Sequence, residues 1–120
     1  MKECAVALQP YIETARKRRQ LERERLQQKR QAALQAAPAA AQVLHETFGV
    51  SRVVVFGSVL DEQTFHAQSD IDLAVWELPP EHYLQAVAKL LSASEFSFDL
   101  VPAESASAYL QAAIAQGMPL

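Results

Sequence analysis

RVVVFGS at residues 52–58 and SDIDLAVW at residues 69–76 are the two stretches that decide the fold of this chain. In the first, a β-branched and aromatic run ends at Gly57-Ser58, which is typical of a buried central strand. In the second, acidic and apolar residues alternate from Asp70 and the run then stays apolar, which predicts a strand with one end in water. The two stretches are therefore expected to be strands of one small sheet.

Helices and a third strand surround these two strands. Pro79-Pro80 opens a predicted helix that runs to Ala93, with apolar residues spaced for one buried face. The stretch FSFDLV at residues 96–101 predicts the third strand, and a last helix is expected over residues 105–116. This order predicts an α/β (α+β) fold, in which helices pack against a small mixed β-sheet.

A basic helical arm precedes this body. Residues 11–35 contain no Gly or Pro and consist almost entirely of good helix formers, which predicts a long N-terminal helix. Pro38 is expected to end or kink it and to begin a second helix, which Gly49 ends. Residues 1–35 hold nine Lys or Arg against four Glu, whereas residues 36–120 hold two against ten acids. We therefore expect a basic arm over 1–35 and an acidic domain over 36–120.

The arm has more than one interpretation. A charge run is usually a solvated helix face, and its few apolar residues would then cover part of the domain. Alternatively, the arm docks on an acidic partner or RNA, or it joins two copies of the chain. The residues best placed for contact cluster in two turns: Leu8, Tyr11, Ile12 and Ala15. Direct nucleic-acid binding by the acidic domain is not expected.

Length and composition exclude several classes of protein. The chain has 120 residues, enough for one compact domain, and its single cysteine excludes an internal disulfide and a cysteine-rich zinc site. No apolar run approaches the ~18 residues of a membrane span. The start of the chain, MKEC, lacks the apolar core of a secretory signal, so a cytoplasmic protein is expected.

The acids predict a metal site. Asp70 and Asp72 are two residues apart on a strand, so their side chains share a face about 6.6 Å apart and repel each other unless a cation lies between them. Asp99 lies in an otherwise apolar strand, where an acid is costly without a partner. If that strand lies beside the other, the three carboxylates form a cluster suited to paired metal ions. The alternative is that Asp70 begins a strand and Asp99 is an exposed residue.

Gly57-Ser58 meets a different chemical need. A glycine at a strand end lets the backbone approach a phosphate closely, and the following helix start offers unpaired N–H groups to an anion. Ser58 adds a hydroxyl donor, or caps the helix instead.

Together these residues resemble the signature of the minimal nucleotidyltransferases (MNT) of the DNA polymerase beta superfamily. The resemblance covers about residues 40–120 and implies a nucleotidyltransferase fold that binds two Mg²⁺ ions and a nucleoside triphosphate. It implies that Asp70 and Asp72 ligate metal, and that Asp99 ligates the catalytic metal and helps to activate the attacking hydroxyl. Gly57 and Ser58 would hold the β and γ phosphates.

The resemblance also implies a role and a partner. Many MNT proteins are antitoxins of HEPN-domain RNase toxins, and several transfer AMP from ATP to a toxin hydroxyl. One departure concerns residues 59–69, which contain no Lys or Arg where the family usually has an Arg. Three alternatives follow: weak or partner-dependent catalysis, an inactive antitoxin that acts by direct binding, and a small-molecule nucleotidyltransferase. An arm cation would compensate if one of these reached the phosphates: Arg16, Arg18, Arg19 or Arg23.

Overall fold

The computed structural model describes residues 2–120, with side chains described from Leu8 onward. Helix α1 (Lys2–Phe48) is continuous over 47 residues, so the predicted break at Pro38 is wrong. Pro38 is exposed, whereas the opposite face of the same turns is buried in the core. This burial offsets the roughly 3 kcal/mol that a proline costs inside a helix. Gly49 ends α1 as predicted, with φ of +68° and its N–H bonded to the carbonyl of His45 at 3.1 Å.

A four-stranded mixed sheet follows. Its strands are β1 (Arg52–Phe56), β2 (Ile71–Trp76), β3 (Phe98–Pro102) and the short β4 (Met118–Pro119). The spatial order is β3-β2-β1-β4. Strand β1 pairs antiparallel with β2 and β4, and β2 pairs parallel with β3. The predicted mixed sheet is therefore confirmed, and β4 adds an edge strand to the three predicted ones.

Short helices connect the strands. A 3-10 helix, η1 (Gly57–Leu60), follows β1, and the predicted helix after β2 consists of η2 (Pro80–His82) and α2 (Tyr83–Ala93). After β3 come η3 (Ala103–Ser105) and α3 (Ala108–Ala115). Helix α3 begins later than predicted because its N-cap is a serine further along, whose hydroxyl accepts a backbone N–H.

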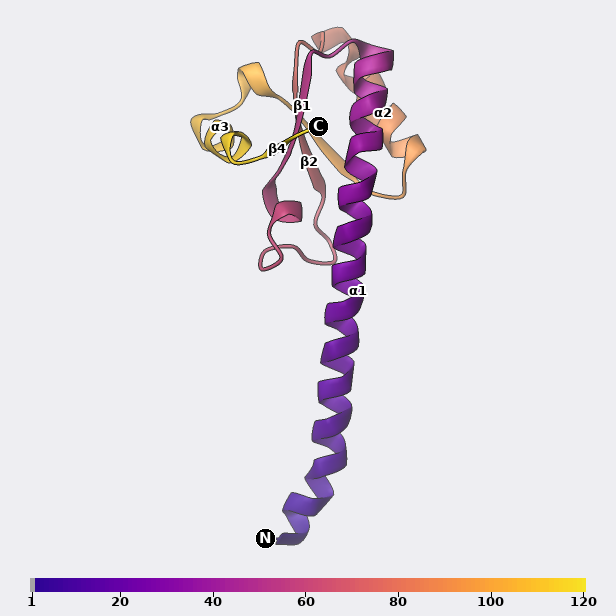
Figure 1. The fold of residues 1–120 in the computed structure, drawn as a ribbon, viewed down its shortest axis with the longest axis vertical. Coiled ribbons are helices and arrows are strands. Elements are labelled where there is room, and N and C mark those ends of the chain that lie inside the picture. The colour runs from indigo at the N-terminus through magenta and orange to yellow at the C-terminus, as the bar shows by residue number, and fades with distance from the viewer. Residues whose placement is uncertain (1) are drawn as a thin grey trace.

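The sheet has a helical layer on each face. Helices α1 and α2 cover one face and α3 covers the other (Figure 1). On the first face, Val55 and Leu73 pack with Leu44 of α1. On the second, Ala74 packs with Ile114 of α3. The two faces are therefore distinguishable by the alternation of residues along β2.

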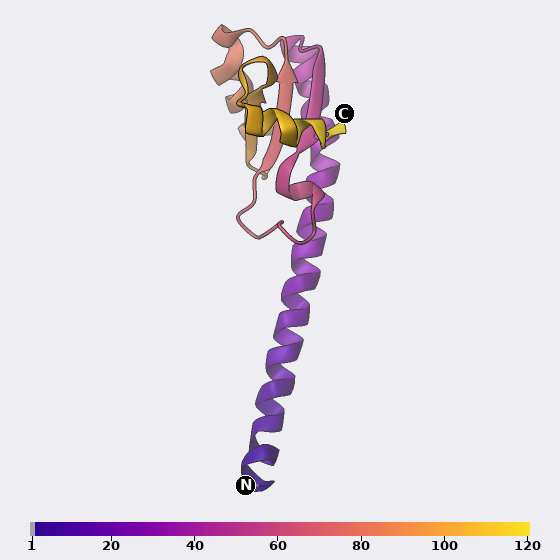
Figure 2. The ribbon, with the colours of Figure 1, turned by 90° about the vertical axis from the view of Figure 1, so that its left-hand side faces the viewer.

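Helix α1 extends beyond the sheet at the end where β1 stops and β2 starts (Figures 1 and 2). The predicted contacts of its N-terminal part with the domain are wrong, because Leu8, Tyr11 and Ile12 are 56, 75 and 42 % exposed. Contact with the body begins instead at Leu26 and continues through Ala33. None of the helices described in residues 2–120 combines the length and the apolar character that crossing a bilayer would require.

Candidate active site

Asp72 and Asp99 lie side by side on neighbouring strands. They are directly paired in the parallel register of β2 and β3. Paired residues of a parallel ladder share a face, and this face is the one that carries Ala74 and α3. The structure therefore brings together the two acids that lie far apart in the sequence.

Asp70 precedes β2 by one residue and is exposed, so it sits at the wet end of the strand rather than within it. Its charge still reaches Asp72. Burial, and then the negative charges of Asp99 and Asp70 in that order, together raise the pKa of the half-buried Asp72 from 3.8 to about 6. The three carboxylates therefore form one electrostatic cluster with Asp72 at its centre.

Gly57 lies against this cluster. Strand β1 pairs with β2 so that Phe56 is opposite Asp72, and the next residue, Gly57, turns with φ of +85°. A Cβ atom at Gly57 would collide with Asp72 Oδ2. A larger residue would have to displace the Asp72 carboxylate and adopt a left-handed backbone, so the position favours glycine. Gly57 starts η1, which also carries Ser58. The pair predicted to hold phosphate therefore adjoins the predicted metal ligands.

The cluster fits a hard divalent cation in its chemistry. Its donors are carboxylate oxygens, which Mg²⁺ prefers, and a cation would relieve the repulsion that perturbs Asp72. Among the described residues, no three His, Cys, Asp or Glu side chains already converge as a metal cage. Ion binding therefore requires the carboxylates to turn about their side-chain torsions toward a shared point, which exposed or half-buried acids can do.

The two cations of the body, Arg52 and Lys89, lie away from the acidic cluster. Arg52 is at the opposite end of β1, with its guanidinium 4.5 Å from the centre of the Trp76 ring. Lys89 is on α2, which covers the other face. Arg23 belongs to α1 and lines a pocket with Glu62 and Phe65 of the loop after η1, so the reach of an arm cation to the phosphates stays a prediction.

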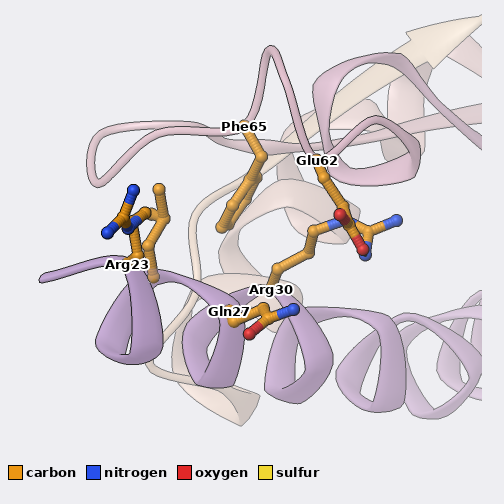
Figure 3. A pocket seen from close by; sticks show the side chains of 6 residues that line it. Arg23, Gln27, Arg30, Glu62 and Phe65 are labelled. Atoms are coloured by element: carbon orange, nitrogen blue, oxygen red, sulfur yellow. The ribbon is translucent and has the colours of Figure 1, made fainter. Parts of the chain in front are cut away.

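A pocket of about 220 Å³ lies between α1 and the loop after η1. Figure 3 shows Arg30 reaching from α1 toward Glu62 of this loop, beside Phe65. Arg30 Nε donates a hydrogen bond to the carbonyl of Val59 at 2.8 Å. The sequence signal for this contact is helical spacing: Arg30 lies on the same face of α1 as the buried Ala33 and Ala37.

Comparison with known proteins gives two matches. A protein-family model described as polymerase beta nucleotidyltransferase matches residues 39–120. Among solved structures, a chain in a crystal structure of a mutant toxin-antitoxin MntA-HpeT is similar, with a TM-score of 0.56 and 25 % sequence identity. The match covers 68 % of this chain and 69 % of that chain. No curated protein matches the chain. The predicted fold class and family resemblance are thereby confirmed.

Proposed function

Since the chain belongs to the polymerase beta nucleotidyltransferase family, we propose that it transfers AMP from ATP to a hydroxyl of a protein partner. The observation that carries this proposal is the register pairing of Asp72 with Asp99 beside Gly57. It combines a concentrated negative charge with a close backbone approach. Nucleotidyl transfer needs both at one place, the first for metal and the second for phosphate.

Each of these groups has a role in the proposed reaction. Two Mg²⁺ ions, held by Asp70, Asp72 and Asp99, would supply Lewis acidity and neutralise phosphate charge when bound. Ser58 and the backbone N–H groups of η1 bind the β and γ phosphates. The Asp99 carboxylate accepts the proton of the acceptor hydroxyl as its oxygen attacks the α-phosphorus. The bond between the α-phosphorus and the oxygen that bridges it to the β-phosphorus breaks. Pyrophosphate leaves with the electron pair of that bond.

The proposed partner is a toxin of the HEPN RNase type, with this chain as its antitoxin. The supporting observation is the likeness to a chain from a solved toxin-antitoxin structure. The projecting part of α1 supports a protein partner as well, because it leaves Leu8 and Tyr11 exposed on a basic helix. Such a surface suits an acidic protein with an apolar patch.

The direct test uses ATP labelled on its α-phosphate, Mg²⁺ and the protein encoded by the neighbouring gene. We expect label on that protein, and a loss of at least about 100-fold with Asp72→Asn, because a metal ligand is removed. Glu81→Gln, which neutralises an exposed acid beyond the opposite end of β2, is the matched control. Wild-type protein that binds the neighbour tightly but transfers no label would overturn the proposed transfer.

One observation favours a second function, an antitoxin that acts by binding alone. Residues 59–69 provide no Lys or Arg to the phosphates, and Arg52 and Lys89 of the body lie elsewhere. A cell-growth experiment distinguishes the two functions. If Asp72→Asn protects cells from the toxin as well as wild type does, binding alone is sufficient.

A further inference from the structure

Two consecutive residues of α1 hold both ends of the loop that joins η1 to Asp70. Arg30 Nε donates to the Val59 carbonyl, inside η1 and next to Ser58. Lys29 Nζ donates to the carbonyl of Ala67, shortly before Asp70. The helix therefore reaches the loop once near the proposed phosphate site and once near the first proposed metal ligand.

Apolar anchors support the same loop. Val59 is fully buried and Phe65 is 4 % exposed, and both belong to the core beneath α1. Arg30 is itself largely buried, with its side chain 18 % exposed and its Nη1 atom 3.6 Å from Glu62 Oε1. Figure 3 shows Arg30, Glu62 and Phe65 together at this junction. The hydrogen bond of Arg30 to Val59 is thus partly buried against the core, whereas Glu62, its ion-pair partner, is exposed.

Arg30 acts on the site through the backbone. Val59 packs on the α1 side of the sheet, whereas Asp72 and Asp99 share the face of α3. The guanidinium is therefore on the opposite side from the acids. Its bond to Val59 instead holds η1, the turn that begins at Gly57 beside Asp72.

We propose that Lys29 and Arg30 are positioning residues: Arg30 orients η1 for phosphate binding, and Lys29 holds the return of the loop toward Asp70. This inference rests on the proposed function, because it assigns η1 the role of a phosphate site. If so, the last cations of the basic arm hold the backbone of the proposed active site in place.

Two substitutions at Arg30 isolate the hydrogen bond. Methionine places a methyl group where Arg30 has Nε, so Arg30→Met retains much of the packing and removes the donor. Glutamine places an amide nitrogen at that point, so Arg30→Gln retains the donor and removes the charge. Arg25→Met, at an exposed position of the same helix, is the control for loss of one cation.

The first measurement is calorimetric titration with MgATP. We expect Arg30→Met to weaken binding about tenfold at unchanged stoichiometry, with Arg30→Gln and Arg25→Met close to wild type. A merely structural role would lower the stoichiometry, because fewer molecules are folded, and would leave the dissociation constant unchanged. That result, or equal binding by Arg30→Met and Arg30→Gln, would overturn the proposal.

The second measurement is backbone amide exchange over residues 57–70, which needs no nucleotide. We expect faster exchange in Arg30→Met than in wild type or Arg30→Gln, and unchanged exchange in β2. Lys29→Met should speed exchange around Ala67. If wild type binds no MgATP, the proposed function fails, and exchange alone then decides whether the two residues hold the loop. Unchanged exchange in both variants would overturn the proposal.

Discussion

At the scale of single residues, Asp72 combines burial with two acidic neighbours, which raise its pKa to about 6 from the ordinary 3.8. The folded state therefore binds a proton more tightly than the unfolded chain, and stability without metal falls as pH rises between these two values. We expect Asp72→Asn to raise the melting temperature at a pH of about 7.5, where Asp72 is ionised, and to change it little near pH 4. Thermal unfolding without Mg²⁺ measures this.

Added Mg²⁺ is expected to remove the advantage in melting temperature that Asp72→Asn has over wild type without metal. Added Mg²⁺ should raise the melting temperature of wild type at the higher pH, because the ion binds the folded state, and should have little effect on Asp72→Asn. Glu81→Gln should respond as wild type does. Equal responses of wild type and Asp72→Asn to Mg²⁺ would contradict a metal site at this carboxylate.

Gly57 and Gly49 form a matched pair of positions. Both have positive φ, so alanine at either adds left-handed backbone strain of about 1–2 kcal/mol. The two positions differ in the space around an added Cβ atom. At Gly49 it would have no atom within 4 Å, whereas at Gly57 it would collide with the Asp72 carboxylate. We expect Gly57→Ala to abolish MgATP binding and Gly49→Ala to reduce stability alone, as calorimetry and thermal unfolding would show. Normal MgATP affinity in folded Gly57→Ala would exclude a role for this close approach.

At the scale of elements, α1 has a projecting part and a part that packs on the body. The packed part includes Leu26, Arg30 and the buried Ala33. We expect removal of residues 1–24 to leave the melting temperature and MgATP affinity nearly unchanged. Removal of residues 1–35 takes these contacts away and should lower the melting temperature by more than about 10 °C.

The pair of truncations also tests the predicted domain boundary at residue 35. A folded 36–120 chain with wild-type stability would support that boundary. Because α1 first contacts the core at Leu26, we propose that the stable unit begins near residue 25. Equal losses in both truncations would instead mean that the projecting part stabilises the body.

At the scale of the whole molecule, opposite charges are separated along the long axis, which spans 69 Å. The projecting arm is basic and the body is acidic, and the arm extends beyond the sheet end that carries Gly57 and Asp72 (Figure 1). A partner held on the arm would therefore lie near the proposed site. We expect Arg19→Glu to weaken partner binding severalfold at low salt and less at high salt. Binding to the neighbouring-gene product at two salt concentrations measures this.

Lys89→Glu, which reverses an exposed cation on α2, is the control and should leave partner binding unchanged. Sedimentation of the protein alone shows whether the arm binds a second copy of this chain instead of another protein. Salt-sensitive dimers that Arg19→Glu dissociates would assign the arm to self-association. Partner binding that is indifferent to both substitutions would leave the arm without a docking role.

The sequence by itself predicted three of the four strands, Gly57 as the residue after the first of them, and Asp70, Asp72 and Asp99 as candidate metal ligands. These follow from local rules, because alternation along a strand and the backbone demands of glycine depend on near neighbours. Only the tertiary structure decided that Asp72 pairs with Asp99, since register is set by the packing of whole strands. Packing likewise keeps α1 continuous through Pro38, against the local preference of proline. The contact of Arg30 with Val59 depends on where α1 lies on the sheet, which a charge run in the sequence does not specify.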